Sequence, residues 1–227
     1  MSFLLTQEWD IIRGAEEEYA AFISRRFQPK CEELGLRGVG GFYVQVGSGP
    51  RIISIRAVES LEALYRAMST RLFQEVKLEL QEHVENYRSK ILAPRSEDPP
   101  RPHDARQSGS AAKPYEIQRG VWKLNQYCTL LPGRRGAFAD FIAREYVPAL
   151  RAIDFVEVTA WWDVLIGGPS EIIGEFTFKH PVDIGRLLDH EDFRRLTYTL
   201  RSEYVADHQS RILRTTERFE EPRWYRL

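Results

Sequence analysis

The spacing of apolar residues changes in the first part of the chain, and each spacing predicts one kind of element. Residues 3–12 alternate, with Leu5 and Gln7 on one face, and this two-residue period predicts a β-strand. Residues 19–34 carry apolar side chains at three- and four-residue steps, which predicts an amphipathic helix. Pro29 lies inside that helical pattern, so we expect a kink or a break there.

Extended and helical patterns continue this first unit. β-branched and aromatic residues fill positions 36–58 on both sides of Gly49-Pro50, which predicts a β-hairpin. A helical pattern covers residues 59–84, and a short extended pattern at residues 87–92 follows it. The sequence therefore predicts the element order β-α-β-β-α-β.

The same order of patterns recurs in residues 115–217. Gln126 lies 119 residues after Gln7, and Pro148 lies 119 residues after Pro29. A repeat of this length is a whole domain, not a solenoid unit. Towards the end of the copies the spacing becomes 121, and we place the two extra residues in the loop before the second helix of the later copy.

Both faces of each predicted sheet carry apolar side chains. The neighbours Phe42 and Tyr43 point to opposite faces, and so do Trp161 and Trp162. Helices of a βαββαβ unit cover one face only, so the other face needs a second sheet. The predicted fold class is α+β, with two tandem βαββαβ units whose antiparallel sheets pair as an α/β barrel.

Composition along the chain predicts four segments. Residues 1–93 and 115–217 are the two repeats, and residues 94–114 are rich in proline, charge and small polar residues. Such a segment buries too little apolar surface to fold, so we expect a disordered linker. Residues 218–227 contain Trp224 and are expected to dock on the chain's own domain or on a second copy.

Charge and hydropathy exclude several classes of partner. The chain has 32 basic and 33 acidic residues among 227, with a net charge of −1. This balance predicts no nucleic-acid partner. No apolar run reaches the roughly 20 residues that span a bilayer, and the N-terminal decapeptide is too short and too acidic for a targeting peptide. We therefore expect no membrane association.

The cysteines and glycines are interpreted as structural. Cys31 and Cys128 occur at non-equivalent points of the two copies, so we expect free thiols and a cytoplasmic location. Glycines at positions 38, 40 and 41 lie inside a strand pattern, which favours a β-bulge or close backbone packing over phosphate binding. The acidic run around His190 favours helix capping and exposure over a metal site. No Walker, Rossmann, zinc or serine-hydrolase motif is present.

Several short segments of the second copy resemble a known superfamily. They are LNQYCTLLPG at 124–133, the helix FADFIAREYVPAL, the Trp-containing hairpin strand, DFRRL at 192–196 and SRILRTT at 210–216. Together with the βαββαβ order, they resemble ferredoxin-like domains of the dimeric α/β-barrel superfamily, and the second copy is similar to NIPSNAP-type domains. Gln7 and Gln126 stand where such domains often carry arginine.

This resemblance implies barrel pairing, often between subunits, but no single reaction. Relatives of the superfamily include oxygenases, isomerases, haem proteins and proteins of unassigned role. We therefore expect a homo-oligomer or an internal pseudo-dimer with a small-molecule ligand. The resemblance also implies haem binding through His180 as a minor alternative to the main expectation, which is no cofactor and no metal.

Polar and aromatic residues on the predicted strands are the candidate site. Asp163 and Glu175 are the candidate catalytic bases, since a half-buried carboxylate can transfer protons. The candidate ligand-binding residues are Gln126, Trp161, Gln7 and Arg56. The alternative is that these side chains face solvent or form ion pairs across the sheet.

Two functions follow from these residues. The first is a NIPSNAP-like protein of unassigned role that self-associates and holds a small apolar ligand. The second is a cofactor-free oxygenase or isomerase acting on a small aromatic or polyketide-like molecule.

Overall fold

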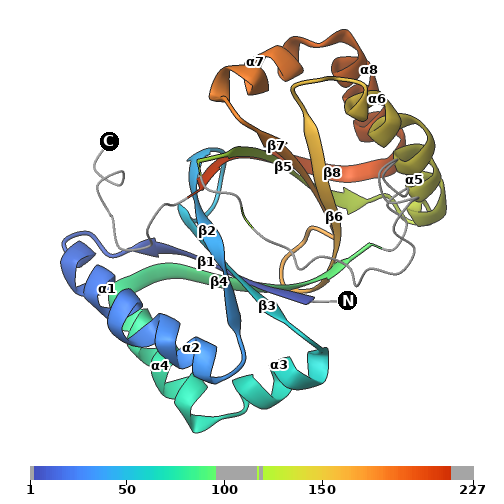
Figure 1. Cartoon of the computed structure of the whole chain (residues 1–227). Coiled ribbons are helices and arrows are strands. Elements are labelled where there is room, and N and C mark those ends of the chain that lie inside the picture. The colour runs from blue at the N-terminus through green and yellow to red at the C-terminus, as the bar shows by residue number, and fades with distance from the viewer. Residues whose placement is uncertain (1–2, 96–116, 118–119, 216–227) are drawn as a thin grey trace, which may run out of the picture. The chain divides into compact units, whose positions relative to one another are not determined.

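The computed structural model describes residues 3–95, 117 and 120–215, and these residues form two compact units (Figure 1). The first unit centres on residues 3–92 and the second on residues 121–213. The predicted linker beyond Arg95 and the predicted docking tail at 218–227 lie outside the described residues.

The elements of the two units follow one another in the same order. The first unit contains β1 (Phe3–Ile11), α1 (Glu16–Phe22), η1 (Ile23–Phe27), α2 (Gln28–Glu33), β2 (Arg37–Val46), β3 (Ile52–Val58), α3 (Leu61–Met68), α4 (Arg71–His83) and β4 (Val84–Pro94). The second contains β5 (Trp122–Leu130), α5 (Arg135–Phe141), η3 (Ile142–Tyr146), α6 (Val147–Arg151), β6 (Glu157–Ile166), β7 (Ile172–Phe178), α7 (Pro181–Asp189), α8 (Glu191–Thr199), η4 (Leu200–Tyr204) and β8 (Val205–Thr215).

Each unit is an antiparallel sheet with helices on one face, as Figure 1 shows. In the first unit β1 pairs with β3 and β4, and β3 also pairs with β2. In the second unit β7 pairs with β5 and β6. The side chains that face the helices form one buried apolar cluster per unit, in which Trp9 and Tyr19 are central to the first and Trp161 and Phe176 to the second. The predicted alternation along residues 3–12 is therefore confirmed.

The spacing between the copies grows in two steps of one residue. Gln7 lies opposite Ser54 on β3, while Gln126 lies opposite Gly174 on β7, so the hairpins are 120 residues apart. The buried Phe73 and Phe193 keep that spacing. The predicted single insertion before the second helix is therefore wrong.

The second extra residue lies at the end of α8. Leu80 and Val84 are buried and four residues apart, whereas their counterparts Leu200 and Val205 are five apart. The chain accommodates this residue as the π-helical turn η4, which is the usual consequence of one insertion in a helix. Unit 1 has a regular α-helix at this position.

The proline inside each first helix produces a π-helical turn and not a break. The N–H of Gln28 donates to the carbonyl of Ile23, five residues back, and Val147 bonds Ile142 in the same way. Pro29 follows at the start of α2, where its missing N–H removes no internal hydrogen bond. The preserved prolines therefore mark a shared helix geometry.

Two further local predictions have a clear outcome. The register of β2 against β3 shifts between Gly38 and Gly40, so the predicted β-bulge at the glycines is confirmed. The helical pattern at 59–84 divides into α3 and α4, because Thr70 caps the second helix by accepting from the N–H of Phe73.

Candidate functional site

Glu175 lies on the face of β7 that points away from the helices. Its side chain is 4% exposed, and its Oε2 accepts a hydrogen bond from Lys123 Nζ at 3.1 Å. Its strand neighbours Gly174 and Phe176 face the helix side, where Trp161 packs against them. Glu175 is thus separated from the helix-side candidates and is held in a buried ion pair.

Asp163 lies on β6 in a network of charges. Its Oδ1 accepts from Arg95 Nη1 at 3.0 Å and from Arg135 Nη1 at 2.9 Å. Arg135 also contacts Glu171 at 3.3 Å, and Arg95 lies over the ring of Phe138. The structure therefore places Asp163 in the ion pairs that the sequence allowed as the alternative to a free base.

Gln126 and Trp161 meet around Tyr146. The hydroxyl of Tyr146 donates to Gln126 Oε1 at 2.9 Å. The rings of Tyr146 and Trp161 are 6.1 Å apart and nearly perpendicular. Complete burial raises the pKa of the Tyr146 hydroxyl far above its ordinary value. Two of the predicted binding residues are therefore brought together, inside the core of unit 2.

Gln7 and Arg56 are buried in unit 1, far along the chain from that group. Gln7 Nε2 donates to the hydroxyl of Tyr87 at 2.8 Å. Arg56 donates to the carbonyl of Leu36 at 3.2 Å and lies over Phe27, and burial lowers its pKa. The strand register makes Phe176, and not a polar residue, the counterpart of Arg56.

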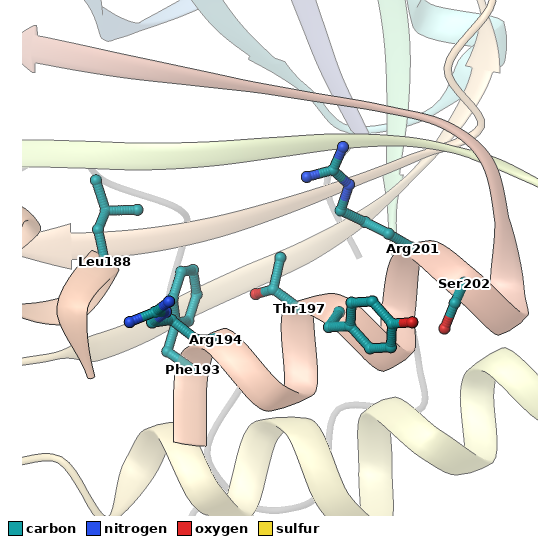
Figure 2. A pocket seen from close by; sticks show the side chains of 7 residues that line it. Leu188, Phe193, Arg194, Thr197, Arg201 and Ser202 are labelled. Carbon is teal, nitrogen blue, oxygen red and sulfur yellow. The ribbon is translucent and has the colours of Figure 1, made fainter. Parts of the chain in front are cut away.

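A pocket that the sequence did not reveal lies along α8 of unit 2. Its volume is about 810 Å³, which falls in the range of small-molecule sites. Figure 2 shows Phe193 and Thr197 of α8 and Arg201 of η4 pointing towards the strands. The lining residues are Leu188, Phe193, Arg194, Thr197, Tyr198, Arg201 and Ser202.

The two arginines of this pocket have no ion-pair or hydrogen-bond partner in the described part of the chain. Arg194 and Arg201 are both exposed and lie seven residues apart, about 10 Å along the helix axis. By contrast, the adjacent Arg195 pairs with Asp192 at 3.3 Å, and Arg186 pairs with Asp183 at 2.9 Å. The pocket thus presents positive charge that no carboxylate of its own helix neutralises.

Thr197 connects the pocket to the core. Its Oγ1 lies 3.4 Å from the hydroxyl of Tyr146, which in turn bonds Gln126. The corresponding residues of unit 1, at the 120-residue spacing, are Lys77 for Thr197, Gln74 for Arg194 and Gln81 for Arg201. Comparison of the copies at the corrected spacing is the only signal in the sequence that could have singled out these positions.

The histidines considered for a metal or haem lie elsewhere. His180 is exposed at the start of α7 and is not among the lining residues of the pocket, so its position gives no support to haem ligation. Within the residues that the structure covers, no group of three or more His, Cys, Asp or Glu side chains could hold a metal ion. His190 occupies the N-cap position of α8 but makes no side-chain capping hydrogen bond, and it is partly buried, so the predicted capping and exposure are not observed.

Solved structures share this fold over nearly the whole chain. An anthrone oxidase-like protein aligns with a TM-score of 0.62 at 11% identity, covering 95% of this chain and 91% of its own. A candidate monooxygenase from Lactobacillus acidophilus aligns with a TM-score of 0.59 at 9% identity, covering 94% and 93%. No protein-family model matches the sequence, and comparison with curated protein sequences gives no match.

The similarity to these solved structures concerns the fold. The predicted fold class is confirmed as α+β, with two tandem ferredoxin-like units of the α/β-barrel kind. A NIPSNAP family protein from Agrobacterium tumefaciens also aligns at 19% identity, covering 44% of this chain and all of its own. That alignment has a TM-score of 0.35 and carries no argument about function. None of the helices that the structure describes is long and apolar enough to cross a membrane.

Proposed function

We propose that the pocket on α8 binds a small amphipathic molecule that carries negative charge. The observation that supports this most directly is the pair of arginines without partners, Arg194 and Arg201, on the wall of the pocket. An anion between them gains charge-assisted hydrogen bonds, which are stronger than neutral ones. Leu188 and Phe193 supply apolar surface for the rest of the ligand.

This proposal makes the chain a binding protein of the α/β-barrel class, which is the first of the two functions expected from the sequence. The ligand differs from that expectation, because the arginines favour an anionic molecule over a purely apolar one. Self-association stays a prediction. A cytoplasmic location also stays one, and the two free, buried thiols Cys31 and Cys128 are consistent with it.

We expect Arg194→Gln and Arg201→Gln each to weaken binding of 8-anilinonaphthalene-1-sulfonate about tenfold, or about 1.4 kcal/mol. Glutamine removes the charge and is the residue that unit 1 carries at both positions. Fluorescence titration measures the affinity, and the uncharged N-phenyl-1-naphthylamine serves as the matched probe. The affinity of this uncharged probe should change less than about twofold, because it has no anionic group that could interact with the arginines.

Arg195→Gln is the control variant, since Arg195 lies on the same helix but pairs with Asp192 outside the pocket. It should leave both titrations unchanged. Equal binding of the sulfonate to all three variants and to the unmodified chain would show that the pocket is not the site.

We propose oxygenation without a cofactor as the second candidate. The fold likeness to an anthrone oxidase-like protein supports it, with 95% of this chain aligned. The reaction would convert anthrone and O₂ to anthraquinone and water, so that the ring methylene is oxidised and O₂ is reduced. Asp163 and Glu175 are the proposed proton acceptors, and each would have to leave its ion pair to act.

An oxygen-electrode assay with anthrone tests this candidate. If it is correct, O₂ uptake should depend on the protein and should fall at least about tenfold in Asp163→Asn or Glu175→Gln, the usual range for loss of a general base being 10²–10⁴. Uptake that equals the protein-free rate would exclude anthrone oxidation, while leaving ligand binding at the α8 pocket unaffected.

A further inference from the structure

A histidine of unit 2 lacks the partner that its counterpart in unit 1 possesses. His208 lies on β8 and is half-buried. Its Nε2 is buried and has no hydrogen-bond partner among the residues that the structure describes.

In unit 1 the corresponding side chain has a hydrogen-bond partner and is covered by a lysine. Tyr87, which is the counterpart of His208 at the 121-residue spacing, receives a hydrogen bond from Gln7. Lys77 also covers the Tyr87 ring, with its Nζ 5.7 Å from the ring centroid. In unit 2 the residue at the position of Lys77 is the much shorter Thr197, which lines the pocket.

Gln126 does not satisfy His208 in the way that Gln7 satisfies Tyr87. The sequence has Phe27 at the position of Tyr146, and the Oε1 of Gln126 accepts from the Tyr146 hydroxyl; among the described residues no hydrogen bond joins Gln126 to His208 Nε2. Arg201 is the pocket residue whose charge acts on His208. Lys77 covers Tyr87 in unit 1, and its counterpart Thr197 lines the pocket in unit 2, so the position of His208 on β8 corresponds to the strand side of the pocket.

We infer that His208 Nε2 accepts a hydrogen bond from a hydroxyl group of the molecule that Arg194 and Arg201 hold. The ligand class is then a hydroxylated aromatic anion, whose acidic group meets the arginines and whose hydroxyl group enters the space that Lys77 fills in unit 1. Arg201 is exposed and has no ion-pair partner among the described residues, so its side chain can turn towards the anion. This inference rests on the proposed function.

Burial, together with the charge of Arg201, favours the neutral form of His208 at neutral pH. Burial lowers its pKa below the ordinary 6.5, the charge of Arg201 lowers it further, and Asp207 on the same strand acts in the opposite direction. The neutral form of the His208 ring is therefore favoured at pH 7. A hydroxyl preference should be present above this lowered pKa and should disappear as the pH falls through it, because protonated Nε2 can only donate.

A matched pair of fluorescent probes tests the inference. 6-Hydroxynaphthalene-2-sulfonate and 6-methoxynaphthalene-2-sulfonate share the anion and the rings, and only the first can donate a hydrogen bond. We expect the hydroxy probe to bind the unmodified chain about tenfold more tightly at pH 7.5, which is about 1.4 kcal/mol. In His208→Phe the ratio should fall below about twofold, while the methoxy probe keeps its affinity.

His208→Gln retains an acceptor and should restore part of the ratio, which a merely structural role of the ring would not do. Thr197→Lys recreates the residue of unit 1 and should weaken both probes. As a measurement that needs no variant, the ¹⁵N resonance of His208 Nε2 should move with the hydroxy probe and stay in place with the methoxy probe.

Each outcome decides between the claims. A tenfold ratio that persists in His208→Phe, or no ratio in the unmodified chain, overturns the role of His208 and leaves the anion pocket standing. Binding of neither sulfonate to the unmodified chain overturns the pocket and the inference together.

Discussion

Trp161→Ala is expected to lower the free energy of unfolding by about 3–5 kcal/mol, the usual loss for a buried aromatic side chain. Trp161 is 4% exposed and packs edge-on against Phe138, Tyr146 and Phe176. It also fills the space above Gly174 on the neighbouring strand, where a Cβ would lie 2.9 Å from the indole. Urea unfolding followed by far-ultraviolet circular dichroism measures the loss.

Gly174→Ser provides the matched comparison for this prediction. Unit 1 has Gly41 and Ser54 at the positions of Trp161 and Gly174, so a serine is tolerated there because no indole ring lies opposite it. Gly174→Ser alone should cost about 1–3 kcal/mol through overpacking, and much less when combined with Trp161→Ala. Additive losses would show that the two side chains do not compete for this space. A normal stability of Trp161→Ala with lost ligand binding would instead support the binding role predicted for Trp161.

Asp163→Asn is expected to cost about 1.5–3 kcal/mol, the range for a hydrogen bond to a charged group. The substitution removes the carboxylate that holds Arg95 and Arg135 at 3.0 and 2.9 Å. The Arg95 side chain is only 9% exposed, so water replaces the lost contact poorly. Thermal and urea unfolding both report the change.

Asp192→Asn is the control for this prediction. It breaks the pair with Arg195, in which both side chains are more than half exposed, and should change stability by less than about 0.5 kcal/mol. If Asp163→Asn has an unchanged melting temperature and a slower anthrone oxidation, Asp163 is a proton acceptor in the reaction and its ion pairs are not structural.

The predicted elements succeeded where one local pattern decides the structure. Alternation along residues 3–12 and the glycines at 38–41 fixed a strand and a β-bulge, because side-chain periodicity and backbone freedom act over a few residues. Pro29 was correctly identified as a disturbance, but its form was not. A π-helical turn satisfies the backbone without a break, and the choice depends on how the whole helix packs.

The candidate site was predicted less well, for a different reason. The sequence identified polar residues on strands but could not show which of them face charges. Glu175 and Lys123 are 52 positions apart, and only the pairing of β5 with β7 brings them together. Gln126 and Trp161 lie on different strands, and Tyr146 between them was not singled out because it lies on a helix.

The sequence by itself determined that this chain is a duplication of a βαββαβ unit, since apolar periodicity, turns and the repeat spacing are all local properties. Only the tertiary structure decided that, among the described residues, Arg194 and Arg201 have no ion-pair partner beside a pocket and His208 Nε2 is buried without a hydrogen-bond partner. Whether a side chain has a partner depends on which groups folding brings close to it, and these groups are distant in the sequence. One inserted residue at the end of α8 and a threonine in place of a lysine distinguish unit 2 from unit 1 there, and neither has a recognisable meaning until the copies are compared as folded structures.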